Sequence, residues 1–161
     1  MRRLFMAGIM LAALGCGGSD SDPMGPDDNG DPGSLPVGSI AARIDGVQWS
    51  NSIPPAVAYT GSILAIGASN PSLITLGFAV IATAPGTYPI GPSEPTNALL
   101  TVGSSGQTWH SSAGGGSGSI TITTLTPGSA AGTFQFTMVA DPASGSSGTR
   151  TVTNGAFNVV F

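Results

Sequence analysis

The sequence contains no lysine, and its 161 residues include only four arginines, eight acidic residues and one histidine. Binding to nucleic acid depends on clustered Lys and Arg that neutralise phosphates, so these numbers argue against a nucleic-acid partner. Five of the aspartates lie between Asp20 and Asp31, whereas from Ile40 onward two arginines stand against three carboxylates, a net charge of −1. The negative net charge of the chain therefore comes mainly from residues 20–31. Strong electrostatic steering of a partner by the rest of the chain is not expected.

Cysteine is equally scarce, because Cys16 is the only one. A single cysteine excludes an internal disulfide and the zinc sites that need several thiolates. No other pattern in the sequence indicates a metal or another cofactor. The 25 glycines and 13 prolines, with few Glu, Lys or Arg, leave no segment after the first 15 residues with the character of an amphipathic helix.

The N-terminus has the pattern of an export signal. Two arginines are followed by the apolar run Leu4–Leu14, which is well short of the ~20 residues of a membrane-spanning helix. We therefore expect residues 1–15 to be a signal peptide.

Ala13-Leu14-Gly15-Cys16 resembles the lipobox of bacterial lipoproteins, with Ala13 in place of the usual leucine. The resemblance implies export and lipidation of Cys16, which would tether the protein to the cell envelope. Because Gly17 follows Cys16 where an aspartate would favour inner-membrane retention, the outer membrane of a Gram-negative bacterium is the expected location. An ordinary signal peptide with an incidental cysteine is the alternative.

Residues 16–37 form an acidic linker of Gly, Pro and Asp that cannot bury enough apolar surface to fold, so the sequence predicts a disordered tether. Asp27 to Asp31 alternate like the start of a calcium loop, but no glutamate closes the loop. A solvated spacer is the simpler interpretation.

Residues 38–161 show an apolar period of two, which is typical of strands with one buried face. Runs such as Ile74 to Val80 and Phe134 to Met138 alternate large apolar and small or polar residues. About eight to ten such strands predict an all-β fold, an antiparallel β-sandwich of the Ig-like or jelly-roll-like kind, with closure of one sheet upon itself as the alternative.

Turn residues divide the predicted strands. Asp45-Gly46 indicates a two-residue type I′ hairpin, and Asn154-Gly155 is expected to start the last strand. Prolines 54, 55, 89, 92 and 95 are expected to protect the sheet edges. The predicted core consists of Ile44, Trp49, Ile66, Leu76, Phe78, Tyr88, Leu100, Ile120, Ile122, Phe134, Phe136, Phe157 and Val159.

Three features, in order, resemble a family of uncharacterised lipoprotein domains of Gram-negative bacteria. They are the opening hairpin Ile44-Asp45-Gly46-Val47-Gln48-Trp49, the central Gly86-Thr87-Tyr88, and the closing segments Gly118–Ile122, Gly132–Phe136 and Thr153–Val159. The resemblance implies a β-sandwich and a lipid anchor, and implies no activity.

Side chains for catalysis are few. His110 is the only candidate base of a Ser-His-Asp triad, no Gly-x-Ser-x-Gly elbow occurs, and Asp45 and Asp141 are expected to be turn residues. We therefore predict no catalytic and no metal-binding residue, and interpret His110 as a surface or strand-end histidine. A hydrolase is the least favoured alternative.

Binding by aromatic side chains is the remaining site hypothesis. Trp109 lies between polar residues before a Gly/Ser loop and is the best candidate for an exposed ring, with His110 beside it. The leading expectation is a non-enzymatic, lipid-anchored envelope protein with a structural or protein-interaction role. A glycan-binding module that uses Trp109 is the alternative.

Overall fold

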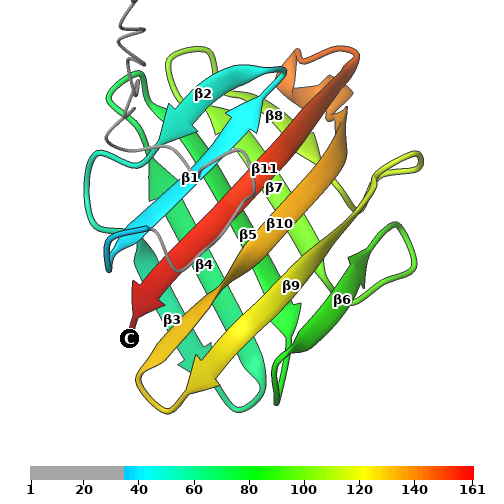
Figure 1. The fold of residues 1–161 in the computed structure, drawn as a ribbon. Coiled ribbons are helices and arrows are strands. Elements are labelled where there is room, and N and C mark those ends of the chain that lie inside the picture. Colours follow the sequence, from blue (N-terminus) through cyan, green and yellow to red (C-terminus); the bar gives the residue numbers. More distant parts are fainter. Residues whose placement is uncertain (1–34) are drawn as a thin grey trace, which may run out of the picture.

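The computed structural model describes residues 35–161, which form antiparallel strands and one short 3₁₀ turn (Figure 1). The predicted signal peptide, Cys16 and most of the predicted linker lie outside the described residues. The elements are β1 (Ser39–Ile44), β2 (Val47–Ser50), β3 (Ala56–Thr60), β4 (Ile63–Ser69), β5 (Ile74–Ile81), β6 (Gly86–Ile90), β7 (Asn97–Val102), β8 (Gln107–His110), β9 (Ser117–Thr126), β10 (Ser129–Ala140), η2 (Pro142–Ser144) and β11 (Thr149–Val160).

The strands form one curled sheet of eleven strands in two layers. The order is β2-β1-β11-β10-β8-β7-β5-β4-β3, and β9 pairs with both β10 and β6. In Figure 1, β2, β1, β11, β10, β9 and β6 form the near layer, and β3, β4, β5, β7 and β8 cross behind it. The predicted all-β antiparallel fold is confirmed, with eleven strands instead of eight to ten.

The two layers are continuous because β10 turns from one into the other. Val139 and Ala140, at the end of β10, pair with His110 and Trp109 of β8. The layers of the predicted sandwich are thus two halves of one curled sheet, joined along a short two-residue ladder.

Phenylalanine rings fill the middle of the core between the layers. Phe78 of β5 lies 5.2 Å from Phe134, 6.1 Å from Phe136 and 5.4 Å from Phe157, measured between ring centroids. Every residue of the predicted core is buried except Ile44 and Tyr88, which are half-buried. Tyr88 lies on edge strand β6, where its hydroxyl donates to the Ala84 carbonyl at 2.6 Å.

The Asp45-Gly46 hairpin has the predicted geometry. β1 ends at Ile44 and β2 begins at Val47, and φ is 50° at Asp45 and 81° at Gly46. Two consecutive left-handed residues define the type I′ turn, whose twist matches that of the flanking strands.

The prediction that Asn154-Gly155 starts the last strand is wrong. β11 begins at Thr149, and the pair forms a bulge inside it, where Asn154 has φ of 50° and the register shifts against both β1 and β10. A Cβ at Gly155 would overlap the Phe134 ring, so the position needs a glycine for close approach rather than for a turn.

Three of the five prolines lie at edge strands, as predicted, whereas Pro92 and Pro95 lie in the loop between β6 and β7. β6 pairs only with β9 and carries Pro89, and β3 pairs only with β4 and follows Pro54 and Pro55. A proline cannot donate to a neighbouring strand, so these positions discourage pairing between molecules.

The outer face of the near layer is covered in one place by the start of the described chain. Leu35 is buried against Ala41 and Ala156, and the side-chain amide of Asn158 donates to the Leu35 carbonyl at 2.9 Å.

Residues 35–161 include no helix with the length and apolar character that crossing a membrane requires.

Candidate functional site

Trp109 is buried, which contradicts the hypothesis that it is an exposed binding ring. The residue is 1% exposed, and its indole Nε1 donates to the Ser147 carbonyl at 3.3 Å. Trp109 points inward from β8 because it alternates with His110, and the side chain of Arg150 covers it from β11. The ring is therefore closed to stacking on a sugar in this structure.

Arg150 connects Trp109 to the first hairpin. Its Cζ lies 4.7 Å from the Trp109 ring centroid, and its Nη1 donates to Asp45 Oδ2 at 2.6 Å. A cation over an indole face is attracted by the ring quadrupole, and the carboxylate orients the guanidinium. The arrangement fixes β8, β11 and the β1–β2 turn relative to one another.

The carboxylate of Asp45 accepts more than the arginine contact. The backbone N–H and the hydroxyl of Thr151 donate to Asp45 Oδ1 at 2.9 and 3.2 Å. Partial burial raises the pKa of Asp45, but the hydrogen bonds from Thr151 and Arg150 and the charge of Arg150 lower it by more. The net result is a pKa below the ordinary value, so Asp45 is ionised at neutral pH.

His110 ends β8 on the outer face, in agreement with the prediction of a strand-end residue. Its Nε2 lies 3.8 Å from Asp141 Oδ2, and the two side chains are 38% and 37% exposed. This distance is too long for a hydrogen bond, so Asp141 does not orient the imidazole as the acid of a triad does. Asp141 instead caps η2, because its Oδ1 accepts from the Ala143 N–H at 3.0 Å.

Ser144 and Ser146, in the loop that follows Asp141, hold that loop together. The Ser146 hydroxyl donates to the carbonyls of Thr108 and Asp141 at 2.6 and 2.9 Å, and the Ser144 hydroxyl donates to the Asp141 carbonyl at 2.8 Å. A nucleophilic serine must give its proton to a base, and these hydroxyls give theirs to backbone carbonyls. No group of three or more metal-binding side chains occurs within residues 35–161.

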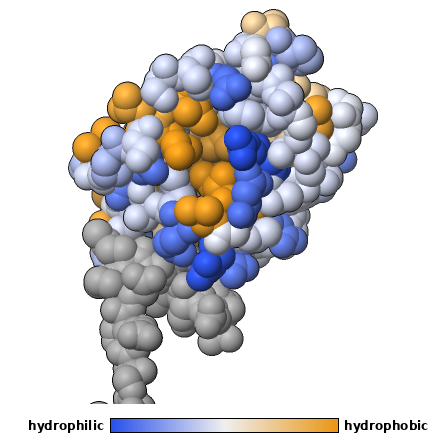
Figure 2. Space-filling model, turned by 90° about the horizontal axis from the view of Figure 1, so that it is seen from above, coloured by the Kyte–Doolittle hydropathy of each residue, from blue (hydrophilic) through white to orange (hydrophobic). Residues whose placement is uncertain are grey.

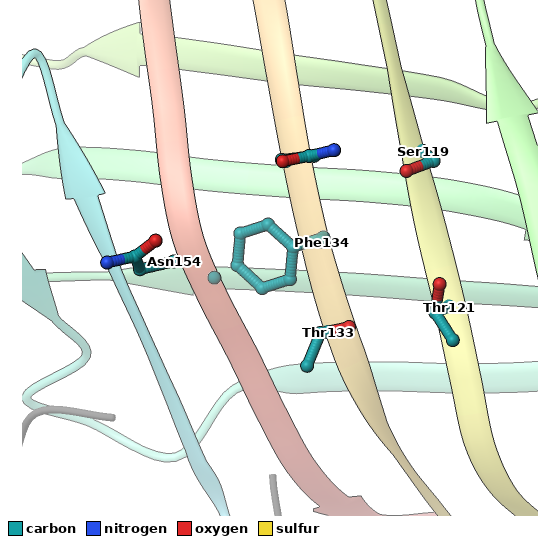
Figure 3. Close-up of a pocket in the computed structure, with 7 residues that line it drawn as sticks. Ser119, Thr121, Thr133, Phe134 and Asn154 are labelled. Atoms are coloured by element: carbon teal, nitrogen blue, oxygen red, sulfur yellow. The ribbon is translucent and has the colours of Figure 1, made fainter. Parts of the chain in front are cut away.

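A shallow depression on the outer face of β9, β10 and β11 is lined by polar side chains (Figure 3). Ser119 and Thr121 come from β9, Thr133 from β10 and Asn154 from β11, and the Phe134 ring lies beneath, where Gly155 has no side chain. The depression offers hydroxyl and amide groups and no ionisable one. It can form hydrogen bonds, but it holds no acid or base.

A deeper cavity opens at the end of the domain that carries the β1–β2, β4–β5 and β7–β8 turns, here called the β1–β2 end. Its volume is about 390 Å³. Seen from this end, the surface has a hollow with an apolar floor and strongly hydrophilic residues along one side (Figure 2). The lining residues are Ile44, Asp45, Val47, Gln48, Trp49, Asn70, Ser72, Ile74, Leu100, Val102 and Arg150.

The sequence did not indicate this cavity, because its walls come from residues far apart along the chain. Trp49, Ile74 and Leu100 each appear as an ordinary inward position of a strand. Trp49, Ile74 and Leu100 line one cavity because the sheet curls and brings their strands together at the β1–β2 end.

Fold and side chains together define a class: an all-β domain of antiparallel strands, with an apolar cavity at one end and, in residues 35–161, no assembled triad or metal cluster. Residues 37–160 match a domain of unknown function, DUF6252, and the chain belongs to that family. Neither a curated protein nor a solved structure matches the chain.

Proposed function

We propose that this chain is a lipid-anchored protein of the cell envelope, in the outer membrane of a Gram-negative bacterium, and that its β-domain is a non-enzymatic interaction module. The observation that carries the non-enzymatic part is the geometry of His110 and Asp141, the one histidine–carboxylate pair within residues 35–161. His110 and Asp141 are more than a third exposed and 3.8 Å apart, and Ser144 and Ser146, in the loop that follows Asp141, donate their hydroxyl protons to carbonyls.

The lipid anchor rests on Cys16 and the apolar run before it. Three acyl chains on one residue give effectively permanent membrane attachment, because each buried CH₂ contributes about 0.8 kcal/mol. The acidic stretch that follows would then separate the domain from the bilayer surface.

The interaction role is supported by the outer face of β4, β5 and β7. No charged residue occurs in these strands, and three large apolar side chains are exposed there: Ile63, Ile81 and Leu99. Ile63 pairs with Ile81, and Leu99 pairs with Gly77 on the same face. An uncharged, partly apolar sheet face suits contact with another envelope protein better than contact with an ionic ligand.

The anchor is tested with the full chain in a Gram-negative host fed an alkyne fatty acid. Cys16→Ser should abolish labelling and release the protein from the membrane fraction, whereas Ser19→Ala should leave both unchanged. A Cys16→Ser chain that stays labelled and membrane-bound contradicts the anchor.

The interaction role is tested with a photocrosslinking amino acid placed at Leu99 or, as a control, at Gln135 on the opposite outer face. We expect discrete adducts to another envelope protein from position 99 only. Adducts to a second copy of the chain, or equal adducts from both positions, contradict the proposal.

The non-enzymatic assignment is tested with p-nitrophenyl esters. We expect hydrolysis no faster than with the His110→Ala variant. Turnover that disappears in both His110→Ala and Asp141→Asn would contradict the assignment.

A further inference from the structure

We propose that the cavity at the β1–β2 end is a binding site for a small, uncharged amphipathic molecule. The inference rests on the cavity alone and is independent of the lipid anchor and of the outer face of β4, β5 and β7.

The floor of the cavity is apolar and belongs to both layers. Trp49 comes from β2 in the near layer, and Leu100 comes from β7 in the far layer; they are 3% and 1% exposed. Ile44, Ile74 and Val102 form half-buried walls above them. Figure 2 shows the resulting hollow, with apolar surface inside it and strongly hydrophilic residues along one side.

The size fits a small molecule. Ligand sites are typically clefts of roughly 300–1,000 Å³ with mostly apolar walls and a few polar groups. The cavity, at about 390 Å³, lies near the lower end of that range. Filling it would remove the apolar walls from water, which is the main source of affinity for an apolar ligand.

The floor is held in place before any ligand arrives. The indole Nε1 of Trp49 donates to the Ile74 carbonyl at 3.1 Å, so the ring is tied across the cavity to β5. The side-chain Oδ1 of Asn70 accepts a hydrogen bond from the Ile74 N–H at 2.9 Å, which fixes the β4–β5 turn at the rim. Preorganised walls reduce the ordering cost of binding.

The charges at the rim cancel. Asp45 and Arg150 are the two charged lining residues, and they form an ion pair at 2.6 Å. An anionic or cationic ligand would have to compete with this pair, whereas a neutral head group would not. This is the reason for assigning an uncharged ligand.

Uncommitted polar groups remain at the rim for a neutral head. Within the described chain, the side chains of Gln48 and Ser72 and the Nδ2 of Asn70 have no hydrogen-bond partner in the protein. An amide and a hydroxyl offer both donors and acceptors, so they can bind a hydroxyl or amide head group while the apolar body lies against Trp49 and Leu100.

The test uses the full chain carrying Cys16→Ser, so that no detergent competes, and the neutral fluorescent probe N-phenyl-1-naphthylamine. We expect saturable binding of one probe per chain. In the Trp109→Phe background Trp49 is the only tryptophan, and its emission should fall as the probe binds, because the two groups would be in contact.

Val102→Phe, which adds bulk inside the cavity, should weaken probe binding about tenfold. Val160→Phe makes the same change at an exposed position at the far end of β11 and should leave binding unchanged. If Val102→Phe does not fold by circular dichroism, Ser72→Phe on the exposed turn replaces it. Absence of saturable binding, or equal affinity in folded cavity and control variants, overturns the proposal.

The charge assignment is tested by displacement of the probe with 1-decanol, decanoate and decylammonium. Decanol should displace it at the lowest concentration. Stronger displacement by decanoate or decylammonium overturns the uncharged class of ligand, even if the cavity itself binds the probe.

Discussion

The guanidinium of Arg150 lies over the indole of Trp109, with its Cζ 4.7 Å from the ring centroid. The two residues are far apart in the sequence and come from β11 and β8, on either side of the strand β10 that joins the two layers. Arg150 covers the edge of the core where β10 joins the two layers. Trp109 is therefore among the most buried residues of the domain, although its neighbours in sequence are polar.

Replacing Arg150 should uncover Trp109. In a Trp49→Phe background, we expect Arg150→Ala to shift the emission of Trp109 to longer wavelength and to lower the free energy of unfolding by about 1–2 kcal/mol, since a cation–π contact and a partly exposed ion pair are lost. Arg150→Lys should lie in between, because lysine keeps the positive charge but lacks the broad guanidinium group that covers the ring. Arg43→Ala, which removes an exposed arginine whose one side-chain hydrogen bond within residues 35–161 is to the Gly46 carbonyl, is the matched control. An unchanged spectrum in Arg150→Ala would show that the guanidinium does not shield the ring.

Acid should weaken the contact at the first hairpin. The pKa of Asp45 is lower in the folded protein than its ordinary value of 3.8, so its carboxylate stabilises the fold above that pH, and the contribution is lost as the pH falls through the folded pKa. Asp45→Asn keeps the type I′ turn but not the ion pair. We expect it to be less stable than the wild type near neutral pH and to approach the wild type below about pH 4, measured by urea unfolding. Because Asp45 and Arg150 are 35% and 41% exposed, the difference should stay under about 1 kcal/mol and shrink in salt. A stability difference that is independent of pH contradicts this account.

Gly155→Ala should destabilise the domain through the core. The new methyl would meet the Phe134 ring, and overpacking of this kind costs about 1–3 kcal/mol. Gly128→Ala, in the exposed β9–β10 turn, meets only the Phe161 carbonyl at 3.9 Å and should be close to neutral. Combining Gly155→Ala with Phe134→Leu should cost less than the sum of the single changes, which a double-mutant cycle by thermal unfolding would measure. Strict additivity would mean that the ring and the glycine do not compete for space.

Leu73→Asn should stabilise the domain. Leu73 has φ of 59° in the β4–β5 turn and is 57% exposed, so it carries the strain of a left-handed residue and buries little surface. Asparagine tolerates that conformation, and relief of the strain is worth about 1 kcal/mol in the free energy of unfolding. Ile53→Asn, an equally exposed position with ordinary φ, should bring no gain. A loss of stability in Leu73→Asn would show that the leucine side chain makes contacts that outweigh the strain.

The alternation of residues predicted most strands, because one buried face requires an apolar residue at every second position. It predicted the inward set of β5 and β10, including Phe78, Phe134 and Phe136. Turn chemistry predicted the Asp45-Gly46 turn, but it failed at Asn154-Gly155, where a pair typical of a turn between strands makes a bulge inside one. The choice depends on whether the flanking segments pair with each other or with other strands, and that information is not local.

In the candidate site, too, local sequence predicted some features, whereas others depend on the pairing of distant strands. His110 was expected at a strand end and lies there, but its distance to Asp141 follows from the β10–β8 ladder and the η2 turn. Trp109 was the best candidate for an exposed ring because its neighbours in sequence are polar. Its burial depends on Arg150, which is brought to it only by the pairing of β10 with both β8 and β11.

The sequence by itself determined that this chain folds as antiparallel strands, where its tight first turn lies, and that few ionisable groups are present, since these follow from period, turn chemistry and composition. The tertiary structure alone decided that two layers are halves of one sheet, that Trp109 lies beneath Arg150, and that Trp49 and Leu100 line one cavity. Local side-chain preferences specify which face of a strand is apolar, but the partner of that face is selected by packing of the whole chain, and a cavity exists only where that packing leaves space.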